Sequence, residues 1–275
     1  KFANKIWNAS RLIFLNMERS GVEPQVVDRG ELQSLEDRWI FSVLHQVAKS
    51  VNSAFEQHRY HEVAEILYHF CWHDFCDWYL EIKKLRLGEN TGMTDDWRNL
   101  LSAYSEWLKL LHPIMPFQTE ELWHRLNRTD SISLQPYPVA GVRDEPAEKE
   151  MALLQDIITS ARNLRANVNR NVQLDAVLYA DKPDVAIIEK LTNLKLEVRP
   201  PGPETHGFHL QINIPVDRKR LEQEIHQYQK LVADKDRQLS NEKFLAGAPP
   251  QVIESLREKR AEYQAQLEKS QAALS

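Results

Sequence analysis

Two histidines and one cysteine come nearest, by residue type and spacing, to forming a metal site. His69, His73 and Cys76 follow one another at steps of four and three, which predicts that they share one face of a helix. Imidazole and thiolate are ligands that zinc accepts. The segment is also rich in Phe and Trp and offers no fourth ligand, a composition typical of a core helix. We favour the core interpretation and expect no metal.

Three carboxylates in the same region raise the question of acid–base catalysis. Asp74, Asp77 and Glu81 lie on helical rows, but a catalytic pair needs two carboxylates that converge in a cleft. Ion pairing with nearby basic residues is the favoured interpretation, and these are Lys83, Lys84 and Arg86. The sequence also lacks glycine-rich phosphate loops and the nucleophile motif of hydrolases. We therefore predict no catalytic residue in this chain, which leaves binding as its function.

A short polar row near the N-terminus could bind RNA. Lys5, Asn8 and Arg11 recur at steps of three, and Trp7 lies between them. Cations, amides and an exposed aromatic ring suit single-stranded RNA, whose unstacked bases need stacking faces and hydrogen-bond partners. An ordinary solvated helix face is the alternative, and spacing alone favours it.

A second basic row, Arg162, Arg165 and Arg170, precedes the first predicted strand and allows the same two interpretations. The whole chain has 275 residues and a net charge of −5. That charge excludes indiscriminate nucleic-acid binding, because phosphate contacts need clustered Lys and Arg. Any contact with nucleic acid must therefore be local.

The composition, 42% hydrophobic and 27% charged, fits a soluble chain that is long enough for more than one domain. We find no run of 18 apolar residues and expect no membrane segment.

Cys71 and Cys76 are five apart in a predicted helix, a spacing at which we expect no disulfide, and a reducing cytoplasm is the expected location. Because the chain opens with Lys1 inside an amphipathic helix, we expect a fragment of a longer protein.

Residues 1–138 are predicted to form an antiparallel helical bundle. Apolar residues at helical spacing indicate helices at about 2–17, 34–55, 61–87, 94–111 and 119–126. Ser34 and Thr94 are expected to cap the second and fourth helices at their N-termini. Gly21 and Gly88 are expected to end the first and the third.

Residues 139–216 are predicted to form a linker and a small α/β domain. After a Pro-rich stretch we expect a helix over 147–169, a strand over 172–180, a helix over 183–194, and strands over 196–199 and 208–216. The last strand is indicated by apolar residues that alternate with polar ones, the period of a strand. They are Phe208, Leu210, Ile212 and Ile214.

Residues 217–275 are predicted to form two long charged helices that fold back on each other as a coiled-coil hairpin. Each has a narrow apolar seam, formed by Leu221, Ile225, Tyr228, Val232 and Leu239 in the first and by Ile253, Leu256, Tyr263, Leu267 and Leu274 in the second. Pro249 and Pro250 suit the start of the second helix. Periodicity alone leaves open whether the coiled coil forms within one chain or joins two chains as a dimer.

Four longer motifs resemble those of a known family. FANKIWNASR at 2–11, FCDWYLE at 75–81 and LHPIMPFQTEELW at 111–123 resemble, in this order, the anticodon-binding domain of class I aminoacyl-tRNA synthetases of the valine, isoleucine and leucine group. The turn LSNEKFLAGAP at 239–249 resembles that of the C-terminal coiled-coil arm of bacterial-type valyl-tRNA synthetases. The chain has no cysteine-rich zinc unit of the kind that often ends isoleucyl enzymes.

The resemblance covers essentially the whole chain, but only the C-terminal portion of such an enzyme. The H-x-G-H and K-M-S-K-S signatures of the catalytic domain are absent, as is the editing domain, and residues 165–172 lack a proline that is usual in the family. The resemblance implies a cytoplasmic parent ligase of protein biosynthesis, which attaches valine to its tRNA with ATP and Mg²⁺. The fragment itself is expected to bind tRNA without catalysis and without a cofactor.

The resemblance also implies which residues contact the valine-accepting tRNA. Lys5, Trp7, Asn8 and Arg11 are expected at the anticodon arm, and Arg162 and Arg165 are expected to bind from the small domain. The contacts expected along the coiled coil, at the outer corner of the tRNA, are Arg218, Lys219, Arg220, Lys230, Arg237, Lys243, Phe244 and Leu245. We expect a monomer that binds neither DNA nor membranes. A structural protein that dimerises through its coiled coil is the alternative.

Overall fold

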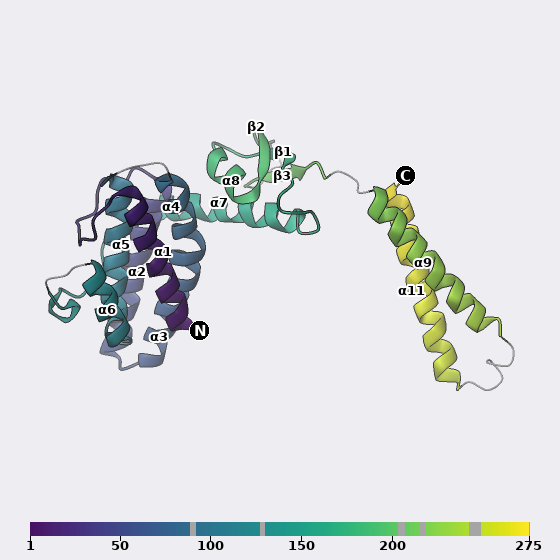
Figure 1. The fold of residues 1–275 in the computed structure, drawn as a ribbon, viewed down its shortest axis with the longest axis horizontal. Helices are drawn as coiled ribbons and strands as arrows, with labels where there is room; N and C mark the ends of the chain where they lie inside the picture. Colours follow the sequence, from purple (N-terminus) through teal and green to yellow (C-terminus); the bar gives the residue numbers. More distant parts are fainter. Residues whose placement is uncertain (89–91, 127–129, 203–206, 215–217, 242–248, 275) are drawn as a thin grey trace. The chain divides into compact units, whose positions relative to one another are not determined.

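A computed structural model of the chain describes residues 1–88, 92–126, 130–202, 207–214, 218–241 and 249–274. This part is mainly helical and contains one three-stranded sheet (Figure 1), which confirms the predicted fold class at that level. The chain divides into two compact units, residues 1–212 and 213–275. Each is described below by itself.

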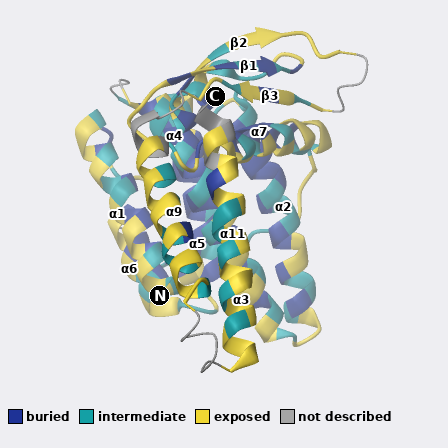
Figure 2. Cartoon of the chain, turned by 90° about the vertical axis from the view of Figure 1, so that its right-hand side faces the viewer, coloured by how far each residue is buried: buried dark blue, intermediate teal, exposed yellow. Residues whose placement is uncertain are grey.

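The first part of unit 1 is a helical bundle. Its helical segments are α1 (Phe2–Ser20), α2 (Leu35–Glu56), α3 (Tyr60–His69), η1 (Phe70–Tyr79), α4 (Leu80–Leu87), α5 (Asp95–Leu111) and α6 (Pro116–Leu126), followed by a 3₁₀ turn η2 (Ile132–Leu134). Figure 2 shows that the inner faces of these helices are buried and the outer faces exposed. The centre of the core is aromatic, since Phe75 stacks on Trp107 with ring centroids 5.0 Å apart and Trp97 and Trp123 are fully buried.

Two bundle helices begin, and the first one ends, where their local signals predict, whereas α6 begins at Pro116, three residues before the predicted start. The hydroxyl of Ser34 accepts a hydrogen bond from the Asp37 amide at 3.3 Å, and that of Thr94 accepts one from the Trp97 amide at 3.4 Å. Each cap satisfies an amide that has no partner within the helix. Gly21 ends α1 with φ of 64°, a left-handed conformation that glycine adopts without steric cost.

The third predicted helix, 61–87, contains a feature that the sequence analysis missed. Its middle, Phe70–Tyr79, is π-helical and lies between α3 and α4. Residues five apart are hydrogen-bonded neighbours in a π-helix. In this segment Cys71 and Cys76 are therefore neighbours, which their spacing in a standard helix did not predict: both are free, buried thiols that share a hydrogen bond. That hydrogen bond and burial raise the pKa of Cys71.

The second part of unit 1 is a small α/β layer. It consists of α7 (Glu145–Leu164), β1 (Leu174–Tyr179), α8 (Val185–Thr192), β2 (Leu194–Arg199) and β3 (His209–Ile212). The strand order is β2-β1-β3. β2 pairs with β1 in parallel, with Leu174 opposite Leu194, and β3 pairs with β1 antiparallel, with Ala176 opposite Ile212. The elements occur in the predicted order, but α7 ends at Leu164, and β3 ends at Ile212 although the strand was expected to continue. Residues 215 and 216 of that expected strand lie outside the described part of the chain.

Ion pairs join the α/β layer to the bundle. Arg38 of α2 donates to Asp144 through Nε at 2.9 Å and through Nη2 at 3.0 Å, and this contact lowers the pKa of Asp144. Arg86 of α4 contacts Asp184, which caps α8, at 3.0 Å. Residues 1–212 are accordingly one compact unit. A division between bundle and α/β layer near residue 138 stays a prediction.

Unit 2 consists of α9 (Arg218–Leu239) and α11 (Pro250–Leu274), which lie side by side (Figure 1). Val232 and Leu267, both in the predicted seam, are buried. The rings of Tyr228 and Tyr263, also in the seam, lie 6.5 Å apart. Arg260 interrupts the apolar pattern and instead donates through Nε to Asp236 at 3.0 Å.

Candidate nucleic-acid interface

The outer face of α1 carries the predicted anticodon-arm residues. Lys5 lies at one edge of this face, where its ammonium donates to Asp77 at 3.0 Å and lies 4.6 Å from the centroid of the Trp72 ring. Burial lowers the pKa of Lys5, but the hydrogen bond to Asp77 and nearby negative charge raise it overall. Lys5 is therefore a charged group held in a fixed position, and its charge is partly neutralised within the protein.

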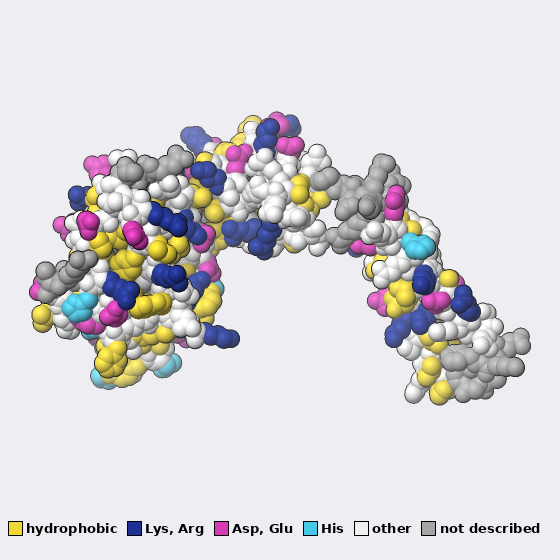
Figure 3. All heavy atoms as spheres, in the orientation of Figure 1, with side chains coloured by type: hydrophobic (Ala, Val, Ile, Leu, Met, Phe, Trp, Pro, Cys, Tyr) yellow, Lys and Arg dark blue, Asp and Glu magenta, His cyan; other side chains and the backbone are white. Residues whose placement is uncertain are grey.

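Trp7 lies at the opposite edge of α1, beside a hollow of about 280 Å³. Trp7 is 37% exposed, and the Arg125 guanidinium lies 4.7 Å from the centroid of its ring. Arg11 lines the same hollow, whereas Asn8 is exposed on the face between Lys5 and Arg11. Among the described residues, neither Asn8 nor Arg11 has an ion pair or a side-chain hydrogen bond, so both remain available to a ligand. Figure 3 shows Lys and Arg side chains among hydrophobic ones on the face of the bundle where α1 lies.

The sequence analysis did not single out Arg125. It lies on α6, 118 positions from Trp7 in the chain, and only the packing of α6 beside α1 brings the two together. The Gln118 side-chain amide, for example, donates to the Ala3 carbonyl at 2.8 Å. Glu121 holds the Arg125 guanidinium in place, at 2.9 Å from both Nε and Nη2.

Arg165 does not lie where a surface contact requires it. The side chain is only 6% exposed, and its Nη1 and Nη2 atoms donate to the backbone carbonyls of Thr192, Asn193, Asn169, Arg170 and Val172. It therefore holds the end of α8 and the start of β1 together, and we correct the expectation that it contacts a ligand through these groups. Arg162, one helical turn earlier, is exposed, and its guanidinium lies 5.7 Å from the Trp78 ring centroid.

In unit 2 the structure describes two of the predicted contact residues fully. Lys230 and Arg237 are exposed on α9, and Arg237 lies 3.8 Å from Asp234. The side chains of Arg218, Lys219 and Arg220 lie outside the described part of the structure. So do Lys243, Phe244 and Leu245 as whole residues.

Of the residues weighed for a metal site, only His69 and His73 lie together, with ring centroids 4.7 Å apart. The side chains of His69 and His73 are 69% and 53% exposed, whereas Cys76 is buried beside Cys71. Within the described residues no group of three His, Cys, Asp or Glu side chains could hold a metal ion. A search of the same residues for a helix long and apolar enough to cross a membrane found none.

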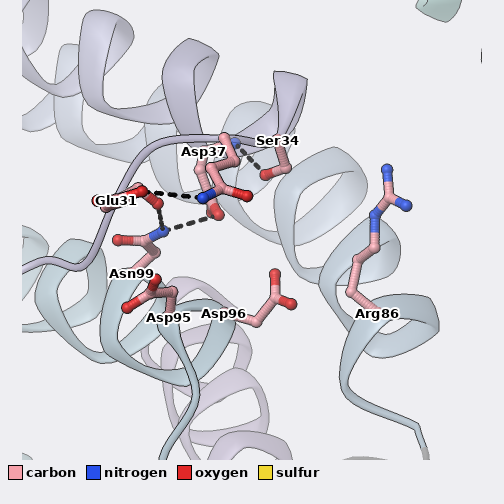
Figure 4. Close-up of a pocket in the computed structure, with 8 residues that line it drawn as sticks. Glu31, Ser34, Asp37, Arg86, Asp95, Asp96 and Asn99 are labelled. Atoms are coloured by element: carbon pink, nitrogen blue, oxygen red, sulfur yellow. Dashed lines mark hydrogen bonds between the residues drawn. The ribbon is translucent and has the colours of Figure 1, made fainter.

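A hollow of about 340 Å³ lies elsewhere in the bundle and is acidic (Figure 4). Its acidic lining residues are Glu31, Asp37, Asp95 and Asp96. The buried ammonium of Lys83 contacts two of them, Asp37 at 2.9 Å and Asp96 at 2.5 Å. The carboxylates make it unsuitable for RNA phosphates.

The sequence analysis grouped Lys83 with nearby carboxylates, but its partners come from α2 and α5. Of the three carboxylates weighed for catalysis, Asp77 pairs with Lys5, and Glu81 pairs with Lys84. Burial raises the pKa of the third, Asp74, to about 6.

Comparison with known proteins relates both units to tRNA ligases. Residues 37–179, more than half of the chain, match the family described as the anticodon-binding domain of tRNA ligase. Residues 213–275 match the family described as the valyl tRNA synthetase tRNA binding arm. These matches follow one another in the chain as the motifs predicted.

Three similar whole proteins are described as valine–tRNA ligases. The chain is 41% identical over 98% of its length to a valine–tRNA ligase of Solibacter usitatus, of which it covers 33%. It is 34% identical over 98% of its length to a valine–tRNA ligase of Enterococcus faecalis, of which it covers 34%. It is also 34% identical over 95% of its length to a valine–tRNA ligase of Geobacillus stearothermophilus, of which it covers 33%. The chain thus spans about a third of the length of these relatives. From these matches, the chain belongs to the family of anticodon-binding domains of tRNA ligases and carries, at its C-terminal end, the tRNA-binding arm of valyl tRNA synthetases.

Proposed function

We propose that this chain binds the valine-accepting tRNA in two places. Unit 1 holds the anticodon arm on the α1 face, through Lys5, Trp7, Asn8 and Arg11, with Arg125 added to that set. The observation that carries this proposal is the exposed Trp7–Arg125 pair beside a hollow, within the same compact unit as an anticodon-binding match. An indole ring and a guanidinium plane are both surfaces on which an unstacked base can lie.

Unit 2 acts in this proposal as an antiparallel coiled coil that lies along the outer corner of the tRNA. The burial of Val232 and Leu267 and the Asp236–Arg260 ion pair support a hairpin within one chain. Its proposed phosphate contacts are Arg218, Lys219, Arg220, Lys230, Arg237 and Lys243, and Phe244 and Leu245 are proposed to touch exposed bases. We propose a monomer, because the apolar seam is already covered within the hairpin.

The chain contributes binding energy and the chemistry belongs to a longer protein. In this proposal the parent is a cytoplasmic valine–tRNA ligase that uses ATP and Mg²⁺ and acts on no DNA. Contacts far from the reacting groups position the tRNA acceptor end and so serve the reaction indirectly.

Sedimentation velocity of the chain, alone and with tRNA, tests the binding and the monomer together. We expect a monomer that forms a one-to-one complex with a valine tRNA transcript and binds a transcript with a changed anticodon more weakly. Since phosphate contacts supply much of the affinity, binding should fall steeply as salt rises. A stable protein dimer, or equal affinity for both transcripts at low salt, would contradict the proposal.

Replacing Trp7 with alanine is expected to weaken tRNA binding by about 1–3 kcal/mol, the usual contribution of one aromatic ring that stacks on a base. Trp7→Phe should retain part of that contribution, because a smaller ring can still stack. Filter binding at fixed salt measures both variants, with Lys49→Ala on the exposed side of α2 as a surface control. If Trp7→Ala binds like the unchanged chain, α1 is not the contact surface.

A further inference from the structure

A second hollow, of about 560 Å³, lies in the α/β layer between the end of α7, the turn that follows it and the end of α8. Its charged lining residues are all basic: Arg162, Arg165, Arg170 and Lys190. Asn163 and Asn193 also line it. This basic lining stands out in a chain whose net charge is −5.

The cations around this hollow lack acidic partners. Within the described residues, Arg162, Arg170 and Lys190 form no ion pair with a carboxylate, and all three are exposed. Their charges are therefore open to a ligand from outside. An exposed cation already paired with a carboxylate would offer much less to an anion, since the carboxylate competes for it.

Buried Arg165 supplies an independent observation. Five backbone carbonyls accept hydrogen bonds from its terminal nitrogens, but its Nε is buried and has no hydrogen-bond partner in the described structure. Carbonyl dipoles solvate the guanidinium, yet among the residues that the structure describes no carboxylate forms an ion pair with it. Burying a cation without a counter-ion costs desolvation free energy. An anion bound in the adjoining hollow would offset part of that cost by compensating the positive charge of Arg165.

We propose that this hollow is a phosphate-binding site, which takes a backbone phosphodiester of the bound RNA. This assignment of the ligand rests on the proposed function, although the site itself does not. Guanidinium groups match the oxygen geometry of phosphate, and here two exposed ones, Arg162 and Arg170, border a hollow next to a third, buried one. Free phosphates share the same chemistry, and the experiment separates the two sources.

The test removes the outer cations without disturbing the buried arginine. Arg170→Ala/Lys190→Ala changes two exposed side chains of the hollow, and Lys49→Ala/Lys149→Ala removes the same charge from exposed positions on α2 and α7 outside it. With valine tRNA, we expect the first double variant to bind about tenfold more weakly at low salt. The slope of log affinity against log salt should fall by about 0.7–0.9 for each phosphate that the protein no longer neutralises. The control pair should change affinity by less than about twofold.

Pyrophosphate titrated into the chain without RNA, followed by ³¹P NMR, distinguishes the sources. Binding of pyrophosphate that the first double variant loses and the control keeps supports the site, even if tRNA binding as a whole fails. In that case the source is a free phosphate and only the proposed function is wrong. The site is overturned if tRNA affinity and salt slope are the same for both double variants and pyrophosphate does not bind. It is equally overturned if the chain binds neither ligand.

Discussion

Replacing Lys83 with methionine should destabilise the helical bundle by about 3–5 kcal/mol, the usual cost of removing one partner of a buried ion pair. Lys83 is fully buried, and the Asp37 side chain facing it is 3% exposed. Methionine fills a similar volume but leaves the Asp37 carboxylate without its cation. In the described part of the chain, the donors that remain for it are the hydroxyl of Tyr79 at 2.8 Å and the amide of Asn99 at 2.9 Å.

Urea unfolding followed by tryptophan fluorescence measures this effect, because all seven tryptophans lie within the first 123 residues and so report on the bundle. Lys84→Met is the matched control, since Lys84 pairs with Glu81 in a partly exposed position where an ion pair contributes about 0–1 kcal/mol. Adding Asp37→Asn to Lys83→Met should recover part of the loss, as the uncompensated charge is then gone. If the free energy of unfolding of Lys83→Met lies within about 1 kcal/mol of that of the unchanged chain, the buried ion pair does not stabilise the bundle appreciably.

Replacing Arg165 with alanine should destabilise the α/β layer by about 3–5 kcal/mol, because hydrogen bonds from a charged donor contribute about 1.5–3 kcal/mol each and do not add fully. The carbonyls that lose their donor include Thr192 at the end of α8 and Val172 before β1. Both segments meet at the Leu174–Leu194 pair that opens the parallel ladder. The loss should therefore loosen β1 and β2 together.

Hydrogen exchange followed by mass spectrometry is the suitable measurement, since the α/β layer contains no tryptophan. Peptides covering β1 and β2 should lose protection in Arg165→Ala, and those covering α5 should keep it. Arg165→Lys should recover only part of the protection, because an ammonium cannot reach five carbonyls as a planar guanidinium does. Arg162→Ala, an exposed arginine on the same helix, serves as control. Unchanged exchange in β1 and β2 would contradict the role assigned to Arg165.

Features that depend on neighbours in the chain were predictable. A cap such as Ser34 or Thr94 needs only an amide three residues later, so its signal lies within one helical turn. The alternation around Leu210 likewise identified a strand, although its length in the structure is shorter. Local spacing did not predict the π-helix at residues 70–79. A standard helix and a π-helix bring different residues of the same sequence next to each other.

By itself, then, the sequence determined the order of the helices, the two long helices of the tail and the motifs that relate the chain to anticodon-binding domains. Only the tertiary structure decided which charged residues are exposed, which are buried, and which partners they contact. Lys83 meets Asp37 across 46 positions, Arg125 meets Trp7 across 118, and Arg165 turns inward to carbonyls up to 28 positions away. The physical reason is that neighbouring residues in the sequence do not determine which partner a long charged side chain contacts. The same arginine can cap a helix, stack on a ring or bind a ligand, and the packing of distant elements around it selects among these.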